Sequence, residues 1–218
     1  MDIDVTEPAP ADSALRRRLL GIGLGGTALS LLPFLMGRAS ATTTSSSTSD
    51  TTPATTTTAP PKRPTNDDVT LLGFAQSVEL AARDLYDVAL STKGFDADQR
   101  AVIATIRESH DAYAASLSAI LGRLAPQQPN AVAASLSSSF AGETSTVLDA
   151  AYGLESTAVA THTDILSKLQ GTDGAQLIAS ILIVESRHGT VLAYLNGRTD
   201  IDDLLVNNEA DALTPAEG

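Results

Sequence analysis

The chain has 218 residues, of which 43% are hydrophobic and 18% charged, enough for one folded domain. With only 4% aromatic residues and no tryptophan, a core of small and aliphatic side chains on packed helices is favoured over a β-sandwich. The net charge of −12 argues against a nucleic-acid partner. The absence of cysteine excludes disulfides, thiol catalysis and cysteine-ligated metals. Any metal must therefore be held by histidine and carboxylates.

Residues 1–41 have the pattern of an export signal. Three arginines at positions 16–18 precede an apolar, glycine-rich run that reaches position 37. Two arginines, any residue and two hydrophobic residues match the twin-arginine pattern, and Ala39-Ser40-Ala41 supplies a small-x-small cleavage site. We therefore expect export beyond the cytoplasmic membrane, to the cell envelope or outside. The alternative that this segment is an uncleaved membrane anchor stays open, because about 17 to 20 apolar residues can span a bilayer. That anchor would then be the only contact of the protein with the membrane.

Low-complexity segments flank the predicted domain. Residues 42–66 are mainly Thr, Ser, Pro and Ala with almost nothing apolar to bury, which predicts a disordered linker. Residues 198–218 hold six acidic residues, with Arg198 as their single base. We expect a short segment around Leu204 to Val206 that frays, followed by a solvated acidic tail.

Between these segments, residues 67–197 show apolar residues at helical spacing in four long stretches. Asp96 with Gln99, and Asp173 with Gln176, have the spacing of capping boxes and mark the starts of the second and fourth stretches. The inward stripe of the second stretch reaches Leu124. The four predicted helices cover residues 67–90, 96–122, 143–169 and 173–196.

The lengths of the connections predict the topology. Links of a few residues join the first helix to the second and the third to the fourth, so each pair folds back as an antiparallel hairpin. The middle connection, residues 123–142, is long enough to run the length of helices of about 35 to 40 Å, with a short helix expected at 131–139. The sequence thus predicts two hairpins joined by one long crossover. We also expect the turns at residues 93–94 and 171–174 to lie at the same end of the bundle.

Each predicted helix carries an acid or a histidine at the middle of its inward face. Ionised carboxylates in a dry core cost several kcal/mol each unless they are paired or bound to metal. The central residues, in chain order, are Glu79, His110, Glu155 and Glu185, with Tyr113 and His188 one turn beyond the second and fourth of them.

With these residues in place, the region 67–197 resembles the ferritin-like family, and the export signal with its Thr-rich linker is similar to exported actinobacterial ferritin-like proteins. The resemblance implies an all-α, ferritin-like four-helix bundle. In metal-binding members the first and third helices each give a Glu, and the second and fourth each give Glu-x-x-His, to a di-iron or di-manganese centre. The resemblance implies Glu79, Glu155, Glu185 and His188 as metal ligands.

The second helix departs from the family pattern. His110 stands where the bridging Glu would be, and Tyr113 stands where its His would be. Because a bridging carboxylate holds two hard cations together, the sequence favours one iron or manganese ion over two, with His110 as a further candidate ligand. His162, about 10 Å along the axis from Glu155, is expected to be a satisfied core histidine or to support a ligand.

Two functional hypotheses follow. The first is an exported ferritin-like protein that binds iron or manganese, with oxidase, peroxide-handling or storage chemistry if two ions bind. The second is a non-catalytic cell-envelope interaction module with a protein partner, in which the polar cluster is a metal-free relic held by hydrogen bonds. Both hypotheses, and the oligomeric state, stay open at the level of the sequence.

Overall fold

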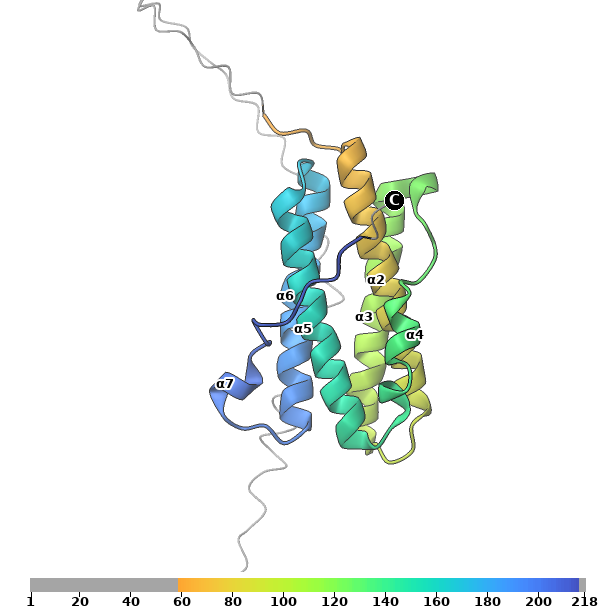
Figure 1. Cartoon of the computed structure of the whole chain (residues 1–218), viewed down its shortest axis with the longest axis vertical. Coiled ribbons are helices and arrows are strands. Elements are labelled where there is room, and N and C mark those ends of the chain that lie inside the picture. Colours follow the sequence, from red (N-terminus) through yellow and green to blue (C-terminus); the bar gives the residue numbers. More distant parts are fainter. Residues whose placement is uncertain (1–58, 216–218) are drawn as a thin grey trace, which may run out of the picture. The chain divides into compact units, whose positions relative to one another are not determined.

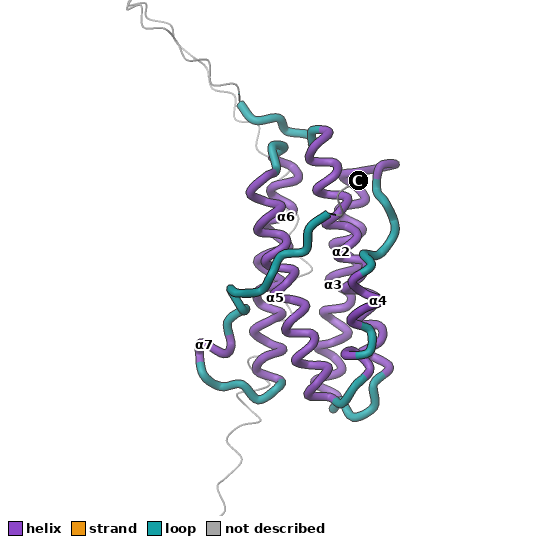
Figure 2. Tube along the Cα trace, viewed as in Figure 1, coloured by secondary structure: helices purple, strands orange, loops and turns teal. Residues whose placement is uncertain are grey.

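A computed structural model of the chain describes residues 59–215, and every regular element in this part is helical (Figures 1 and 2). The all-α prediction is therefore confirmed for these residues. The predicted signal, residues 1–41, and most of the linker lie outside the described residues. The four long helices are α2 (Asn66–Ser91), α3 (Ala97–Leu121), α5 (Thr144–Lys168) and α6 (Thr172–Leu195). The shorter ones are η1 (Gly122–Leu124), α4 (Val132–Leu136), η2 (Ser139–Ala141) and α7 (Ile201–Leu204).

The first two long helices begin with reciprocal side-chain caps. Thr65 precedes α2, and its hydroxyl accepts the N–H of Asp68 at 3.2 Å while the Asp68 carboxylate accepts the N–H of Thr65 at 2.8 Å. Asp96 and Gln99 make the same exchange at the start of α3, at 2.8 and 3.1 Å. Both capping boxes are local in sequence, which is why a four-residue pattern can predict them.

The start of α6 differs from the prediction. The helix begins at Thr172 after Gly171, which gives no side-chain cap, and Asp173 lies in the first turn instead of at the cap. The carbonyl oxygens of Pro61 and Lys62 accept the N–H groups of Thr172 and Asp173, both at 3.0 Å. The expectation of a free linker is therefore wrong for its last residues, which cap a helix of the second hairpin.

The crossover runs along the outside of α2, as predicted (Figure 1). Near its start, the N–H of Gln127 donates to the buried side chain of Gln76 at 3.2 Å. At its far end Phe140 is fully buried, edge-on to the ring of Tyr86 with the centroids 5.8 Å apart. These two anchors hold the crossover along the length of the bundle.

The expectation that the two short turns share an end of the bundle is wrong. Gln170 and Gly171, in the second turn, donate their N–H groups to the carboxylate of Asp68 at the beginning of α2, at 2.8 and 2.9 Å. The first turn follows the other end of α2. A crossover that returns along the whole bundle starts the second hairpin at the opposite end from where the first one finished, so the turns lie at opposite ends (Figure 1).

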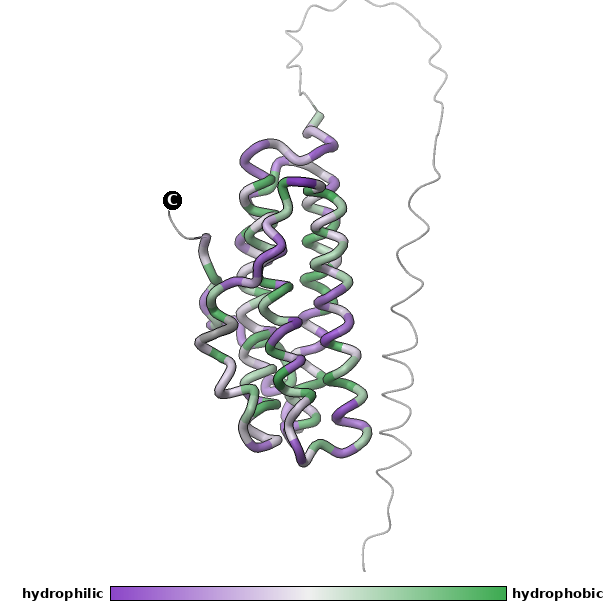
Figure 3. The backbone as a smooth tube through the Cα atoms, turned by 90° about the vertical axis from the view of Figure 1, so that its right-hand side faces the viewer, coloured by the Kyte–Doolittle hydropathy of each residue, from purple (hydrophilic) through white to green (hydrophobic). Residues whose placement is uncertain are grey.

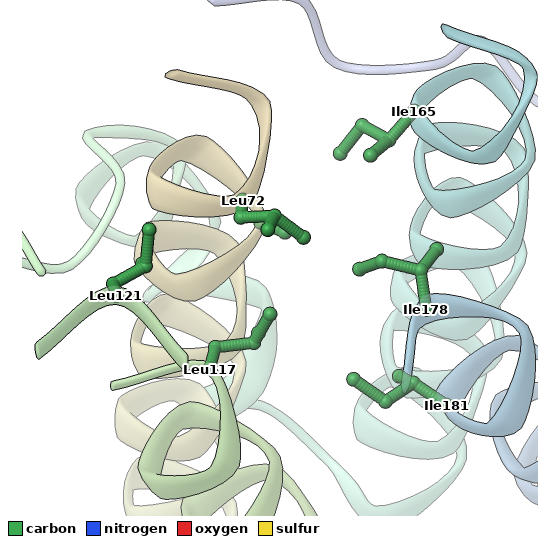
Figure 4. Packing of buried hydrophobic residues seen from close by; sticks show 7 residues of the cluster. Leu72, Leu117, Leu121, Ile165, Ile178 and Ile181 are labelled. Atoms are coloured by element: carbon green, nitrogen blue, oxygen red, sulfur yellow. The ribbon is translucent and has the colours of Figure 1, made fainter. Parts of the chain in front are cut away.

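An aliphatic cluster fills the bundle at the end where α2 begins (Figure 4). Hydrophobic and hydrophilic residues alternate along each long helix (Figure 3). This pattern is typical of helices that bury one apolar stripe. The cluster consists of Leu72, Ala75, Leu117, Leu121, Ile165, Ile178 and Ile181. Leu124, expected on the inward stripe, is 65% exposed because α3 ends at Leu121 and Gly122 turns the chain with a φ of 58°.

Among the described helices, α6 is the one that is long and apolar enough to cross a membrane by length and composition, with a mean hydropathy of 1.2. Its residues Ile178 and Ile181 are completely buried in the bundle, and so is Glu185 at its middle. The face of α6 that carries these residues therefore packs in the core of the bundle.

The C-terminal segment also departs from the expected solvated tail. After α7 the chain turns back and crosses α5 (Figure 1). The Tyr152 hydroxyl donates to the carbonyl oxygen of Leu205 at 2.5 Å. The N–H of Asn207 donates to the Ser156 hydroxyl at 3.2 Å, and the N–H of Leu213 to the Thr161 hydroxyl at 2.9 Å. Polar side chains on α5 thus bind this segment, which amphipathic spacing alone does not reveal.

Candidate metal centre

The five residues predicted as metal ligands meet inside the bundle. Glu79 comes from α2, His110 from α3, Glu155 from α5 and Glu185 from α6, and all four are 0% exposed. His188, one turn after Glu185 on α6, has 12% of its side chain exposed and is the point where this group reaches the surface. Helical periodicity predicts this convergence, because one inward residue from each helix must meet at the same level.

His110 joins two carboxylates from different helices. Its Nδ1 lies 2.7 Å from Glu79 Oε2 and its Nε2 lies 3.1 Å from Glu155 Oε1. When both carboxylates are ionised, each contact is a hydrogen bond only if the ring nitrogen carries a proton, so the arrangement favours the imidazolium form of His110. Burial by itself would lower the pKa of His110, but Glu155 and Glu79 together raise it well above 6.5. In this arrangement neither ring nitrogen of His110 offers a free lone pair to a metal.

Glu155 is the most fully hydrogen-bonded acid of the cluster. Its Oε1 accepts the hydroxyl of Tyr86 at 2.5 Å as well as His110, and its Oε2 lies 3.3 Å from Nδ1 of His188. Burial would raise the pKa of Glu155, but His110 and then His188 lower it below the usual 4.5. Burial and Glu155 raise the pKa of Tyr86 well above 10, so its hydroxyl stays a donor. Glu155 is therefore an ionised carboxylate with both oxygens engaged.

His162 lies within the cluster and is not a satisfied core histidine. Its Nδ1 is 2.8 Å from Glu185 Oε2, whereas its Nε2 is 3.3 Å from Glu79 Oε1 without hydrogen-bond geometry. Burial would lower the pKa of His162, but Glu185 and Glu79 raise it to about 9. The first of the two roles predicted for His162 is therefore wrong, whereas its contact with Glu185 agrees with the second, a group that supports a ligand.

A spacing in the sequence does carry a signal for this contact. Tyr86 follows Glu79 by seven residues, and His162 follows Glu155 by seven residues. Two helical turns beyond its own Glu, each ring reaches across to the Glu of the other helix: Tyr86 to Glu155 and His162 to Glu79. The two hairpins thus repeat one arrangement, with a phenol in the first and an imidazole in the second.

Within residues 59–215, three buried side-chain atoms have no hydrogen-bond partner, and all three belong to this cluster: Glu79 Oε1, His162 Nε2 and Glu185 Oε1. Unsatisfied buried polar groups cost about 1 to 3 kcal/mol each and are few in native proteins. Burial raises the pKa of Glu185 to about 7, although His162 opposes the shift. One half of the cluster is therefore saturated around Glu155, and the other half is incomplete.

Histidine and carboxylate side chains of the cluster lie close enough together to hold a metal ion. Two sets of three residues, His110 with Glu155 and His188, and Glu79 with His110 and Glu185, bring ligand atoms within 4.8 Å of one another. Imidazole and carboxylate ligands together suit iron, manganese and zinc. The buried residues of α3 include His110 and no carboxylate, so this helix contributes a histidine to the cluster where the other three long helices each contribute a Glu.

Fold and site together define a ferritin-like four-helix bundle with a buried Glu/His cluster. Comparison with protein families gives the same class: the family described as Ferritin-like domain matches residues 67–198, more than half of the chain. The chain belongs to this family, and the resemblance seen in the sequence is confirmed for that region. Neither the comparison with curated proteins nor the comparison with solved structures finds a match.

Proposed function

We propose that this protein is an exported ferritin-like protein that binds one divalent iron or manganese ion in its Glu/His cluster. The observation that carries the proposal is the set of three buried, unpartnered atoms on α2, α5 and α6: Glu79 Oε1, His162 Nε2 and Glu185 Oε1. Two carboxylate oxygens and an imidazole nitrogen are all satisfied at once by a cation of this class. Glu79 and Glu185 are also positions at which the family resemblance implies ligands.

The charges of the cluster support one ion. Glu79, Glu155 and Glu185 supply three negative charges when ionised, and the His110 imidazolium offsets one of them, since His162 is neutral once its ring nitrogen binds the ion. One divalent cation offsets the remaining two. A second divalent ion would leave the buried cluster with two excess positive charges, which a low-dielectric interior disfavours strongly.

The residues of the chain have distinct tasks in this proposal. Iron or manganese, when bound, supplies Lewis-acid and redox chemistry. Glu155 is held by Tyr86 and His110 and in turn positions the ring of His188 at the edge of the cluster. His188 is the partly exposed member of the cluster, so the proposal assigns the approach of small polar molecules to this side chain. Oxidase, peroxide-handling and storage reactions that use two ions would need a bridging carboxylate that α3 does not provide.

The metal is tested on full-length protein purified from a host that exports it. We expect about one equivalent of iron or manganese per chain by elemental analysis. Adding Fe(II) without oxygen, or Mn(II), to metal-free protein should raise the melting temperature, because a ligand at a hundredfold excess over its dissociation constant stabilises the fold by about 2.7 kcal/mol. Glu79→Gln with Glu185→Gln should abolish the shift. An unshifted wild-type melt would favour the metal-free cell-envelope interaction module instead.

Export is tested separately. The proposal assigns residues 1–41 to a twin-arginine signal, whose receptor reads the arginine pair and not its charge. Changing Arg16 and Arg17 both to Lys should therefore trap the protein in the cytoplasm, as judged by fractionation, while changing Arg38 to Lys should leave export intact. Continued export of the double variant would contradict this assignment without affecting the metal proposal.

A further inference from the structure

We infer that the ion of the proposed function is held by Glu79, Glu185 and His162, so that His162 supplies the nitrogen ligand in place of His188. This inference rests on the proposed function, because it names the ligand set of the same cluster. His162 is outside the Glu-x-x-His pattern by which the resemblance implies ligands; the structure, not the motif, points to it.

The first argument is which donor atoms are free. His110 has both ring nitrogens on carboxylate oxygens. His188 has Nδ1 facing Glu155 Oε2 at 3.3 Å, and its Nε2 is not one of the buried atoms that lack a partner. Glu155 has both oxygens engaged. Within residues 59–215 the buried side-chain atoms without a partner are the Nε2 of His162 and the Oε1 atoms of Glu79 and Glu185, three residues that are each 0% exposed.

The second argument is distance. His162 Nε2 and Glu79 Oε1 are 3.3 Å apart without hydrogen-bond geometry. Neighbouring ligands that each bind one ion at about 2.0 to 2.2 Å in a tetrahedral or octahedral arrangement are separated by roughly 3 to 3.5 Å. Glu79 and Glu185 also have ligand atoms within 4.8 Å of each other, in a set that includes His110. A separation that is poor for a hydrogen bond is thus suitable for two ligands of one cation.

The third argument is the orientation of the ring. Histidines that bind metal through one nitrogen almost always donate the other N–H to a carboxylate or carbonyl, which fixes the tautomer. His162 has this arrangement, with Nδ1 2.8 Å from Glu185 Oε2. The lone pair is then on Nε2, directed away from Glu185 Oε2 and close to Glu79 Oε1. Glu185 would thus orient His162 through one oxygen and bind the ion through the other.

The fourth argument is what a site on the other side of the cluster would leave behind. An ion bound at Glu155 and His188 would lie next to His110, whose Nε2 is 3.1 Å from Glu155 Oε1. The Oε1 atoms of Glu79 and Glu185 and the Nε2 of His162 would then stay buried without a partner. An ion held by these three atoms removes that cost.

The direct test uses the fact that the chain has only three histidines. Full-length protein labelled with ¹⁵N-histidine is titrated with Zn(II), a diamagnetic probe that binds such sites more tightly than Mn(II) or Fe(II). We expect saturation at one equivalent, with the large ¹⁵N shift of coordination on Nε2 of His162 and only small changes on His188. Saturable binding with the coordination shift on His188 would overturn the inference and leave the proposed function standing. Absence of saturable binding would overturn both.

Matched substitutions give a second readout. His162→Gln and His188→Gln make the same chemical change on α5 and α6, and circular dichroism with thermal melts of the metal-free proteins reports whether each one folds. Calorimetric titration with Zn(II) and Mn(II) should show at least a 100-fold loss of affinity for His162→Gln, and a change within about threefold for His188→Gln. The reverse ranking would overturn the inference. If His162→Gln does not fold, the histidine resonances of the wild-type protein decide the question.

Discussion

Asp68 is the residue at which the two hairpins are joined at one end of the bundle, and its replacement by Asn is the sharpest test of the fold. The buried carboxylate accepts N–H groups from Thr65 at 2.8 Å, Gln170 at 2.8 Å and Gly171 at 2.9 Å. Asn keeps one acceptor oxygen but directs an NH₂ group at one or two of these donors. Loss of charge-assisted bonds together with one unsatisfied buried N–H should cost about 2 to 4 kcal/mol.

The assay is chemical and thermal unfolding of Asp68→Asn beside Asp67→Asn, the same change at the exposed neighbouring residue in the first turn of α2. Both variants lose one negative charge near the helix start, so their difference isolates the contacts of Asp68. A loss of about 2 to 4 kcal/mol corresponds to a melting temperature roughly 6 to 12 °C lower. A difference of less than 0.5 kcal/mol between the variants, roughly the spread of ordinary surface substitutions, would refute the reasoning.

The pH dependence of that difference has a defined sign. Burial would raise the pKa of Asp68, but the backbone donors and the Thr65 hydroxyl outweigh it and lower the pKa below 3.8. A group whose pKa is lower in the folded state stabilises the fold above its unfolded pKa, and that contribution is lost as the pH falls through the folded value. The wild-type advantage over Asp68→Asn should therefore be constant between pH 5 and 7 and shrink below pH 3.8. An advantage that grows in acid would contradict the assignment.

Two further substitutions test close approaches of the backbone. A Cβ at Gly171 would lie 2.7 Å from the Arg63 carbonyl oxygen, so Gly171→Ala should lower the melting temperature. The control is Gly153→Ala, at an exposed position of α5 with open space around the new Cβ, which should leave the melting temperature unchanged or slightly higher. Equal melts would contradict the contact. A Cβ at Gly189 would meet Val206 at 2.9 Å, so Gly189→Ala should release the C-terminal segment and speed its proteolysis with little change in the melt. Unchanged proteolysis would show that this segment does not lie there.

The parts of the fold that follow from local sequence could be predicted. Helix existence, the capping box of Asp96 and Gln99, and the long crossover depend on residues a few positions apart or on loop length. The cap of α6 could not be predicted, because the backbone carbonyls of residues 61–62 accept its first N–H groups. Every residue has a carbonyl, so the sequence carries no signal for this contact. The prediction that the two turns share one end was wrong for another reason. A crossover that runs along the whole bundle already requires the turns to lie at opposite ends.

The sequence could predict that the candidate residues converge inside the bundle, but not which of their atoms face one another. Periodicity placed Glu79, Glu155 and Glu185 together, because a helix directs one residue in three or four towards the core. Which oxygen is free and which is hydrogen-bonded depends on side-chain reach across four helices. The contacts of His162 show this limit, because axial rise along one helix gives its distance from Glu155 but not from the acids on α2 and α6.

Restoring the family pattern on α3 tests the charge argument on which the one-ion proposal depends. His110→Glu replaces a cation with an anion, a change of two charges, which equals one more divalent ion, and Tyr113→His adds the nitrogen ligand that the family pattern has one turn later. The double variant should therefore bind two equivalents of Mn(II) or Fe(II) where the wild-type protein binds one.

The metal-free double variant should also be less stable than the wild type, because four buried carboxylates then lack the His110 cation, and metal should restore the loss. His110→Gln with Tyr113→His is the matched control: it removes the cation without adding a carboxylate, so it should still bind no more than one equivalent. Elemental analysis of the folded proteins after dialysis gives the stoichiometry. If the Glu variant is folded and still binds a single ion, the absence of a bridging carboxylate is not what limits the wild-type cluster to one, and charge balance is not the rule that sets its occupancy.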